Sequence, residues 1–230
     1  MSPRRSDCET QDAGSRRCLA GLSHSTIYRD YERAFTQGTG LPLSLHAPQM
    51  LNLVRYARGQ ENPFCALFAK TNQTCAACYA LQQKLEEEAH LRPKTLKCFA
   101  GLCETAVPVR VGDYLIAFLQ TGQVLLHRPG MTQFNRIAAT LIRWGAEVDL
   151  KTLEEAYFNT RILKPQQYES LIRLLTIFAQ HLGSCASQLA LQSEQPEPEA
   201  VTRARSYVNQ NYREVISLPA VARVANMSAN

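Results

Sequence analysis

The sequence has neither a long apolar run nor an export signal, and both absences restrict the class of protein. No stretch approaches the roughly 20 apolar residues that a membrane helix requires, since the richest one, LIRLLTIFAQHLGSC, includes Arg173 and His181. The amino terminus, MSPRRSDCETQDAGSRRCLAG, is charged throughout and offers no apolar core for a signal peptide. We therefore expect a cytoplasmic protein that does not contact a membrane.

The patterns that mark common enzymes are missing as well. The sequence has no Gly-rich phosphate loop and no HExxH pair. Histidines stand singly in the chain and form no recognisable triad, as for His46, His90, His127 and His181. A thiol oxidoreductase is disfavoured because no βαβ pattern surrounds the single CxxC motif. These absences favour a binding protein over an enzyme.

The chain is long enough for one well-packed domain with appendages, because 45% of its 230 residues are apolar. Its net charge of +5 is compatible with contact to nucleic acid but is not specific for it. Changes in composition predict four segments. They are a disordered polar leader (1–24), a main domain (25–190), a linker rich in Pro and Glu (191–200) and a terminal helical segment (201–230).

Apolar periodicity near the start of the main domain predicts a helix followed by a strand. The helix covers STIYRDYERAFTQGTG, behind a Ser/Thr cap, and its apolar face is expected to hold Ile27, Tyr31, Ala34 and Phe35. The strand covers LPLSLH, in which leucines alternate with other residues. A second helix is predicted over AACYALQQKLEEEAHL, with a solvated acidic face of Glu86, Glu87 and Glu88.

The strongest sheet signal lies in AVPVRVGDYLIAFLQTGQVLLHR. Two apolar runs flank Gly112-Asp113, a pair that suits a tight hairpin turn. We expect QVLLHR, after Thr121-Gly122, to be a third strand of an antiparallel meander. The fold class is therefore α+β, with helices flanking an antiparallel sheet.

A long amphipathic helix is predicted from Pro165 onward. Its apolar residues recur at intervals of three and four: Tyr168, Leu171, Ile172, Leu175, Phe178, Ala179, Leu182, Ala186 and Leu189. A stripe of this length can cover the protein's own sheet, or it can pair with a second copy and make a homodimer through residues 166–190. The sequence leaves both uses open.

The last segment contains the first half of a helix-turn-helix pattern. In ISLPAVARVANMS the Leu-Pro step starts a helix, and Leu218, Val221, Ala222 and Ala225 would face a preceding helix, with Ser228 in the following turn. The stretch ARSYVNQNYREVISLPAVARVANMS resembles the start of the DNA-binding domain of AraC/XylS-type transcription regulators. The resemblance implies a recognition helix beginning near Asn230, so we expect a longer form to bind DNA and this chain alone not to. A fragment or a truncated gene would equally give this ending.

The main domain resembles a second family. The order NPFCALFAKTNQTCAACYALQQK, LKCFAGLCETAVPVRVGDYLIAFLQTGQV and LKPQQYESLIRLLTIFAQHLG is similar to the PocR sensory domain, a PAS-like module. The resemblance implies a transcription regulator that senses a small molecule, such as a diol or a similar hydrocarbon derivative. The residues that we expect to line the ligand site are Phe64, Cys65, Cys75, Cys98, Phe99 and Gly101.

The cysteines support an alternative function. Cys75 and Cys78 form a CxxC pair, followed by Cys98 and Cys103, and four thiolates could hold zinc or an iron–sulfur cluster. The second pair has four intervening residues where zinc ribbons have two, so the match is loose. The CxxC pair could also be redox-active if a helix start lowers the pKa of the attacking thiol. Buried structural thiols are the third reading. The cofactor, if there is one, is therefore unknown from the sequence.

Overall fold

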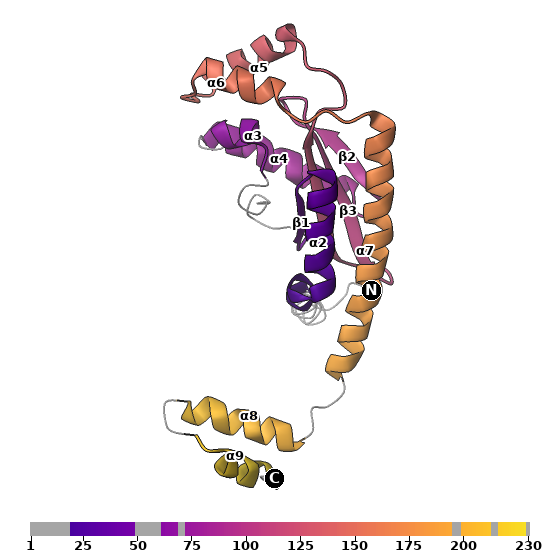
Figure 1. Cartoon of the computed structure of the whole chain (residues 1–230), viewed down its shortest axis with the longest axis vertical. Helices are drawn as coiled ribbons and strands as arrows, with labels where there is room; N and C mark the ends of the chain where they lie inside the picture. Colours follow the sequence, from indigo (N-terminus) through magenta and orange to yellow (C-terminus); the bar gives the residue numbers. More distant parts are fainter. Residues whose placement is uncertain (1–18, 49–60, 69–71, 195–198, 213–215, 229–230) are drawn as a thin grey trace, which may run out of the picture. The chain divides into compact units, whose positions relative to one another are not determined.

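The computed structural model describes residues 19–48, 61–68, 72–194, 199–212 and 216–228 (Figure 1). The chain divides into two compact units, Met1–Ala186 and Ser187–Asn230. The helices are α2 (Thr26–Thr39), α3 (Pro63–Phe68), α4 (Asn72–Glu88), α5 (Met131–Arg143), α6 (Leu150–Phe158), α7 (Pro165–Glu194), α8 (Glu199–Asn211) and α9 (Leu218–Ala225). The strands are β1 (Leu43–His46), β2 (Lys94–Lys97), β3 (Cys103–Val111) and β4 (Tyr114–Val124).

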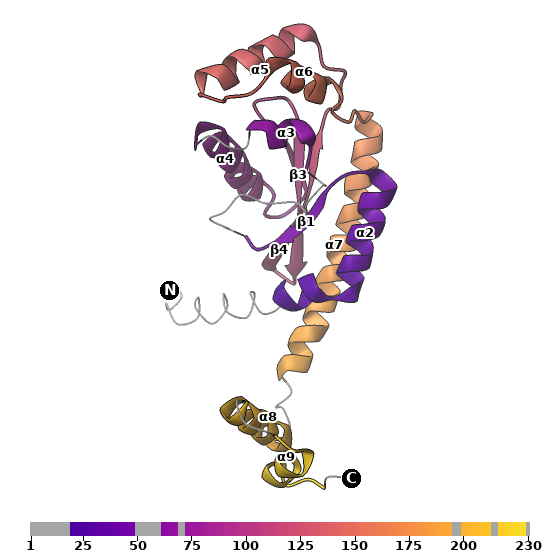
Figure 2. The same ribbon diagram turned by 60° about the vertical axis from the view of Figure 1, so that its left-hand side comes forward.

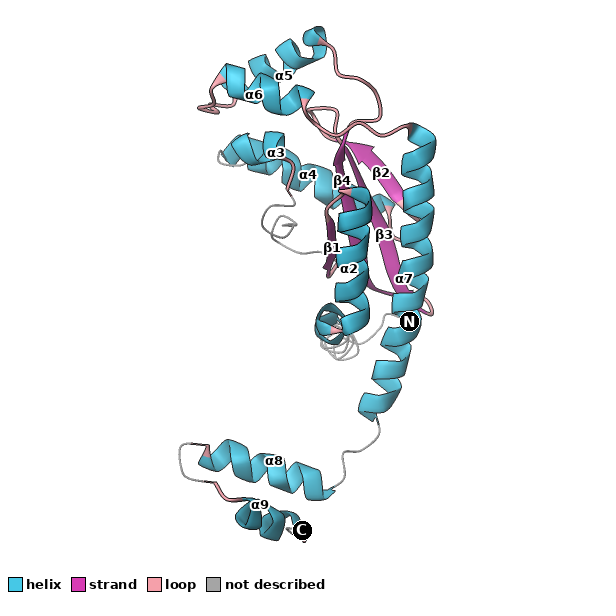
Figure 3. Cartoon of the chain, viewed as in Figure 1, coloured by secondary structure: helices cyan, strands magenta, loops and turns pink. Residues whose placement is uncertain are grey.

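The first unit is built on one antiparallel sheet with the strand order β1-β4-β3-β2 (Figure 3). The α+β class and the hairpin are confirmed, and Gly112 at the turn has a φ of 57°. The expected third strand over QVLLHR is wrong, because β4 runs without a break through Thr121 to Val124. Gly122 and Gln123 have φ values of 152° and 58° and form a bulge in this strand. The other neighbour of β3 is β2, which the sequence did not predict.

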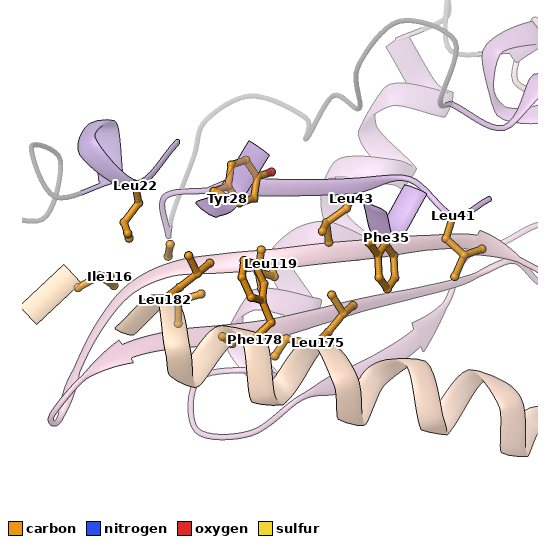
Figure 4. Packing of buried hydrophobic residues seen from close by; sticks show 14 of the residues in the cluster. Leu22, Tyr28, Phe35, Leu41, Leu43, Ile116, Leu119, Leu175, Phe178 and Leu182 are labelled. Atoms are coloured by element: carbon orange, nitrogen blue, oxygen red, sulfur yellow. The ribbon is translucent and has the colours of Figure 1, made fainter. Parts of the chain in front are cut away.

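One face of the sheet is covered by α7 and α2 (Figure 2). The long helix lays Leu175, Phe178 and Leu182 against this face, where they pack with Leu43 and Leu119 of the strands (Figure 4). The apolar stripe of α7 therefore covers the protein's own sheet, the first of the two uses left open. At the upper end of the stripe the Tyr168 hydroxyl is hydrogen-bonded to Thr105 Oγ1 at 2.7 Å.

The opposite face of the sheet is covered by α4 (Figure 2). Leu85 in the last turn of α4 and Ala89 directly after the helix pack on Phe118 and Ala106 of the strands. A further apolar cluster joins α3, α5, α6 and the turn before β3 beyond the end of the sheet. The central strands β3 and β4 are thus covered on both faces, whereas Thr95 and Lys97 of the edge strand β2 are exposed.

Two expectations about the amino-terminal part need correction. Residues 19–24, placed in the disordered leader, are helical, and Leu22 is fully buried in the cluster under α7. The rest of the leader lies outside the described residues. In α2 the buried face is formed by Tyr28 and Phe35, whereas Ile27 and Ala34 are exposed. Tyr31 was also expected on this face and does pack on the core, where it stacks on Phe178, so the correction concerns Ile27 and Ala34 only. The cap is confirmed, because Ser25 Oγ accepts a hydrogen bond from Tyr28 N.

The second unit contains α8 and α9, which pack against each other. The side chain of Ser217 caps α9 by accepting from Ala220 N, and Asn226 ends the helix in the left-handed conformation with a φ of 55°. Ala222 and Ala225 are buried, as expected for a face toward a preceding helix. Leu218 was expected on that face but is 70% exposed, because it occupies the first position of the helix. Val221 is partly buried and Ser228 is exposed.

The linker expected over 191–200 is shorter than its composition suggested. Helix α7 continues to Glu194 and α8 begins at Glu199, while 195–198 lie outside the described residues. Among the helices that the structure describes, none combines the length and apolar character needed to cross a membrane.

Candidate functional site

Most of the residues expected to line a ligand site lie together at one end of the sheet. Phe64 of α3 is fully buried there, and Cys65, Cys98 and Phe99 pack against the same apolar cluster. Aromatic rings surround Phe64, with ring centroids 5.0 Å away for Phe68 and 4.9 Å away for Tyr157. Phe99 stacks edge-on against Trp144 at 4.9 Å. Phe64 itself is a packed core residue, so any bound molecule would meet its partly buried neighbours first.

The turn before β3 shapes this end of the sheet. Cys98 N donates to Leu102 O and Gly101 N donates to Cys98 O, both at 2.9 Å. Gly101 has a φ of 83°, which a residue with a side chain adopts only with strain. The Tyr157 hydroxyl donates to Ala100 O at 3.1 Å and ties the turn to α6. Gly101, which was predicted to line the ligand site, therefore has a structural role as well, because the turn requires a residue that can adopt this φ.

Helix α3 is fixed to the sheet through a cap that uses the β4 bulge. Asn62 Oδ1 accepts from Phe64 N at 2.8 Å, and Asn62 Nδ2 donates to the carbonyl of Gln123 at 2.9 Å. The Gln123 side chain completes the link, because its Oε1 accepts from Asn62 N at 2.6 Å. The bulge thus positions Phe64 and Cys65 against the end of the sheet, and sequence analysis did not anticipate it.

The thiols near this cluster are held in their neutral form. Burial is the main cause that raises the pKa of Cys98 to about 12 and that of Cys78 to about 11. The Cys65 pKa is also raised well above its usual value, first by burial and then by the negative charges that Cys98 and Glu104 can carry. Because the thiolate is the attacking form, burial makes Cys65, Cys78 and Cys98 poor nucleophiles.

The four cysteines of the metal hypothesis are not brought together. Successive residues of a strand point to opposite faces of the sheet, and Cys103 packs under α7 in the cluster with Val107 and Leu119. Cys98 packs in the other cluster, at the end of the sheet, and Cys75 and Cys78 lie on α4. Within the described residues, no group of three or more His, Cys, Asp or Glu side chains could hold a metal ion. In this arrangement Cys103 lies under α7 while Cys98 lies in the cluster at the end of the sheet, so the four thiols of the predicted tetrad do not face one site.

Three polar residues that sequence analysis did not select are enclosed between the sheet and α4. Ser44 and His46 lie two residues apart on β1 and share a face, and Gln120 of β4 stands opposite Ser44. We call these three the polar row. His46 is 6% exposed and Gln120 is 5% exposed. Among the described residues, Ser44 Oγ, Gln120 Oε1 and both ring nitrogens of His46 have no hydrogen-bond partner, although His46 Nε2 lies within ion-pair distance of Glu86. A buried polar group without a hydrogen-bond partner lowers the free energy of unfolding by about 1–3 kcal/mol. A polar molecule that bonds to these atoms would therefore stabilise the fold.

A buried carboxylate from α4 reaches the polar row. Glu86 Oε1 lies 3.4 Å from His46 Nε2 and accepts a hydrogen bond from Gln82 Nε2 at 3.1 Å. Glu86 was expected on a solvated acidic face, but it is only 8% exposed, whereas Glu87 and Glu88 are exposed. The three consecutive residues point in different directions around the helix, and the first of them faces the sheet.

The first unit thus consists of one antiparallel sheet that α2 and α7 cover on one face and α4 covers on the other, with polar side chains buried beneath α4. Residues 25–186 match the family described as the sensory domain found in PocR, and the chain belongs to that family. The predicted PocR-type sensory domain is confirmed, and its match ends where the first compact unit ends, whereas the AraC/XylS resemblance stays a prediction.

The comparison with individual proteins agrees with the family. The regulatory protein PocR of Salmonella typhimurium (strain LT2) is 25% identical to this chain over 136 residues. The alignment covers 57% of this chain and 43% of that protein, so the chain spans less than half of that relative's length. No solved structure matches the chain.

Proposed function

We propose that this chain is the effector-sensing part of a transcription regulator of the AraC type. The observation that carries the proposal is the match of residues 25–186 to a sensory family, followed in the chain by the helix pair α8 and α9, of which α9 is capped by Ser217. The relative is itself named a regulatory protein. The effector is a short diol or a similar hydrocarbon derivative, bound in a PAS-like fold at the α4 side of the sheet. DNA contact belongs to a longer form in which a recognition helix follows α9.

The signal would pass through α7, because this helix packs on the sheet and extends beyond the first unit to Glu194. Effector binding can shift α7 only if the effector binds two arrangements of the sheet and helix with different affinity. The polar row and the stripe of α7 lie on opposite faces of the same strands, separated by a single layer. A displacement of β1 or β4 would therefore reach α7 directly.

Dimerisation through α7 would use the outer side of the helix. The stripe residues Tyr168, Leu175 and Leu182 are buried in the protein's own core and cannot face a partner at the same time. Leu174 and Ile177 are 48% and 64% exposed on the same helix and remain open to a second copy. We therefore place the homodimer contact of residues 166–190 on this outer side.

The test is a titration of the purified chain with 1,2-propanediol and 1,3-propanediol, followed by calorimetry and by sedimentation velocity. Binding of either diol, together with a dimer that Ile177→Glu converts to monomer, is the expected result. Ile142→Glu is the matched control, because Ile142 is similarly exposed, at 57%, on α5. A chain that is monomeric at all concentrations would contradict the dimer, and a chain that binds no diol would contradict the effector class.

A further inference from the structure

The polar row places unpartnered side chains inside the protein, on the sheet face that α4 covers. Ser44 and Gln120 stand opposite each other, and His46 lies two residues further along β1. The remaining register partners are apolar, since Phe118 is paired with His46 and Ala106 is paired with Gln120 on its other side. A few placed polar groups in apolar surroundings are typical of sites that orient a small molecule.

The neighbours of the polar row decide which of its atoms donate and which accept. Gln120 Nε2 points to Glu104 Oε2 at 3.5 Å. A carboxylate only accepts, so the amide nitrogen belongs on that side and the amide oxygen is left open as an acceptor. His46 Nε2 lies 3.4 Å from Glu86 Oε1, so a proton on this nitrogen faces a carboxylate, and the tautomer that carries its proton there presents Nδ1 as an acceptor. The Ser44 hydroxyl can do either.

We propose that the polar row holds the effector and selects alcohols and amines that present two hydrogen-bond donors over carboxylic acids of the same length. A diol or an amino alcohol can donate to Gln120 Oε1 and to His46 Nδ1 while it exchanges a hydrogen bond with Ser44. A hydroxy acid has one donor and places acceptor oxygens against a protein acceptor, which leaves buried groups unpaired. Sites built on hydrogen bonds reject such mismatches strongly. This inference rests on the proposed sensing function and adds its residues and its selectivity.

The experiment compares three compounds that differ only at one carbon: 1,2-propanediol, 1-amino-2-propanol and lactate. Calorimetry and thermal shift with the whole chain should show binding of the diol and the amino alcohol, with lactate at least about tenfold weaker. Gln120→Met keeps the length of the side chain and removes its polar atoms, so it should weaken diol binding about tenfold or more. Gln180→Met is the matched control, because Gln180 is exposed on α7, and it should bind the diol like the wild type. Ser44→Ala is the second variant if Gln120→Met does not fold by circular dichroism.

The outcomes separate the inference from the function beneath it. Lactate binding as tightly as the diol, or full diol affinity in both Gln120→Met and Ser44→Ala, would overturn the inference and leave the sensing function standing. The inference is also overturned if Gln120→Met raises the melting temperature without weakening diol binding. In that case the polar row holds only water. A wild-type chain that binds none of the three compounds would overturn the proposed effector class and the inference together.

Discussion

The close packing of α7 on β3 leads to a quantitative prediction for Gly183. A Cβ atom added at this position would lie well inside van der Waals contact with the backbone carbonyl of Arg110. A backbone atom cannot rotate away as a side chain can, so α7 would have to lift from the sheet and loosen the packing of Ala179 and Ala186. Overpacking of this kind costs roughly 1–3 kcal/mol, and the rigid neighbour favours the upper part of that range.

The net effect of Gly183→Ala follows by subtraction. Alanine favours a helix over glycine by about 1 kcal/mol, so a steric cost of about 3 kcal/mol leaves a loss of about 2 kcal/mol in the free energy of unfolding. For a unit of this size that loss lowers the melting temperature by about 4–8 °C.

Gly38→Ala is the matched control for this prediction. Gly38 lies in the last turn of α2 and nothing is within 4 Å of its added Cβ atom, so this change should raise the free energy of unfolding by about 0.5 kcal/mol. Urea unfolding and thermal unfolding followed by circular dichroism measure both variants. If Gly183→Ala is as stable as the wild type while Gly38→Ala behaves as expected, the contact between α7 and β3 is not as close as described.

Three further changes have defined outcomes. Tyr168→Phe removes the buried hydrogen bond to Thr105 and should lower the free energy of unfolding by about 1 kcal/mol in urea, whereas an unchanged midpoint would contradict the contact. Burial raises the pKa of Cys78 to about 11 and that of Cys98 to about 12, so the folded state keeps protons that the unfolded state loses. The contribution of the two buried thiols to the free energy of unfolding should be complete below about pH 9 and decline toward pH 11. Urea midpoints that do not fall as the pH rises through this range would refute this. Ser217→Ala removes the cap of α9, and a loss of about 1 kcal/mol should speed amide exchange in α9 roughly fivefold while α5 is unchanged.

The elements with a strong local signal could be predicted from the sequence. The stripe along α7 and the hairpin at Gly112 were both recognised, because apolar spacing and turn chemistry act within a few residues. The short strand β2 was missed because its four residues, KTLK, carry two lysines and have no apolar alternation of their own. It forms by pairing with β3, a contact that local patterns do not encode.

The candidate site was predicted in part. The expected ligand residues Phe64, Cys65, Cys98 and Phe99 do gather in one cluster, and whether they contact an effector stays a prediction. The polar row was missed, because polar residues that alternate with leucines on a strand usually face solvent. Here that face is covered by α4, so the same pattern encloses them.

By itself, the sequence determined the family, the fold class, the positions of the main helices and the hairpin, because each depends on motifs or on periodicity within a short stretch. Only the tertiary structure decided which faces of those elements are buried. It placed Cys103 under α7 and Cys98 in the separate cluster at the end of the sheet, and it turned Glu86 inward to His46. The physical reason is that burial depends on what packs against a surface, and the partner comes from a distant part of the chain.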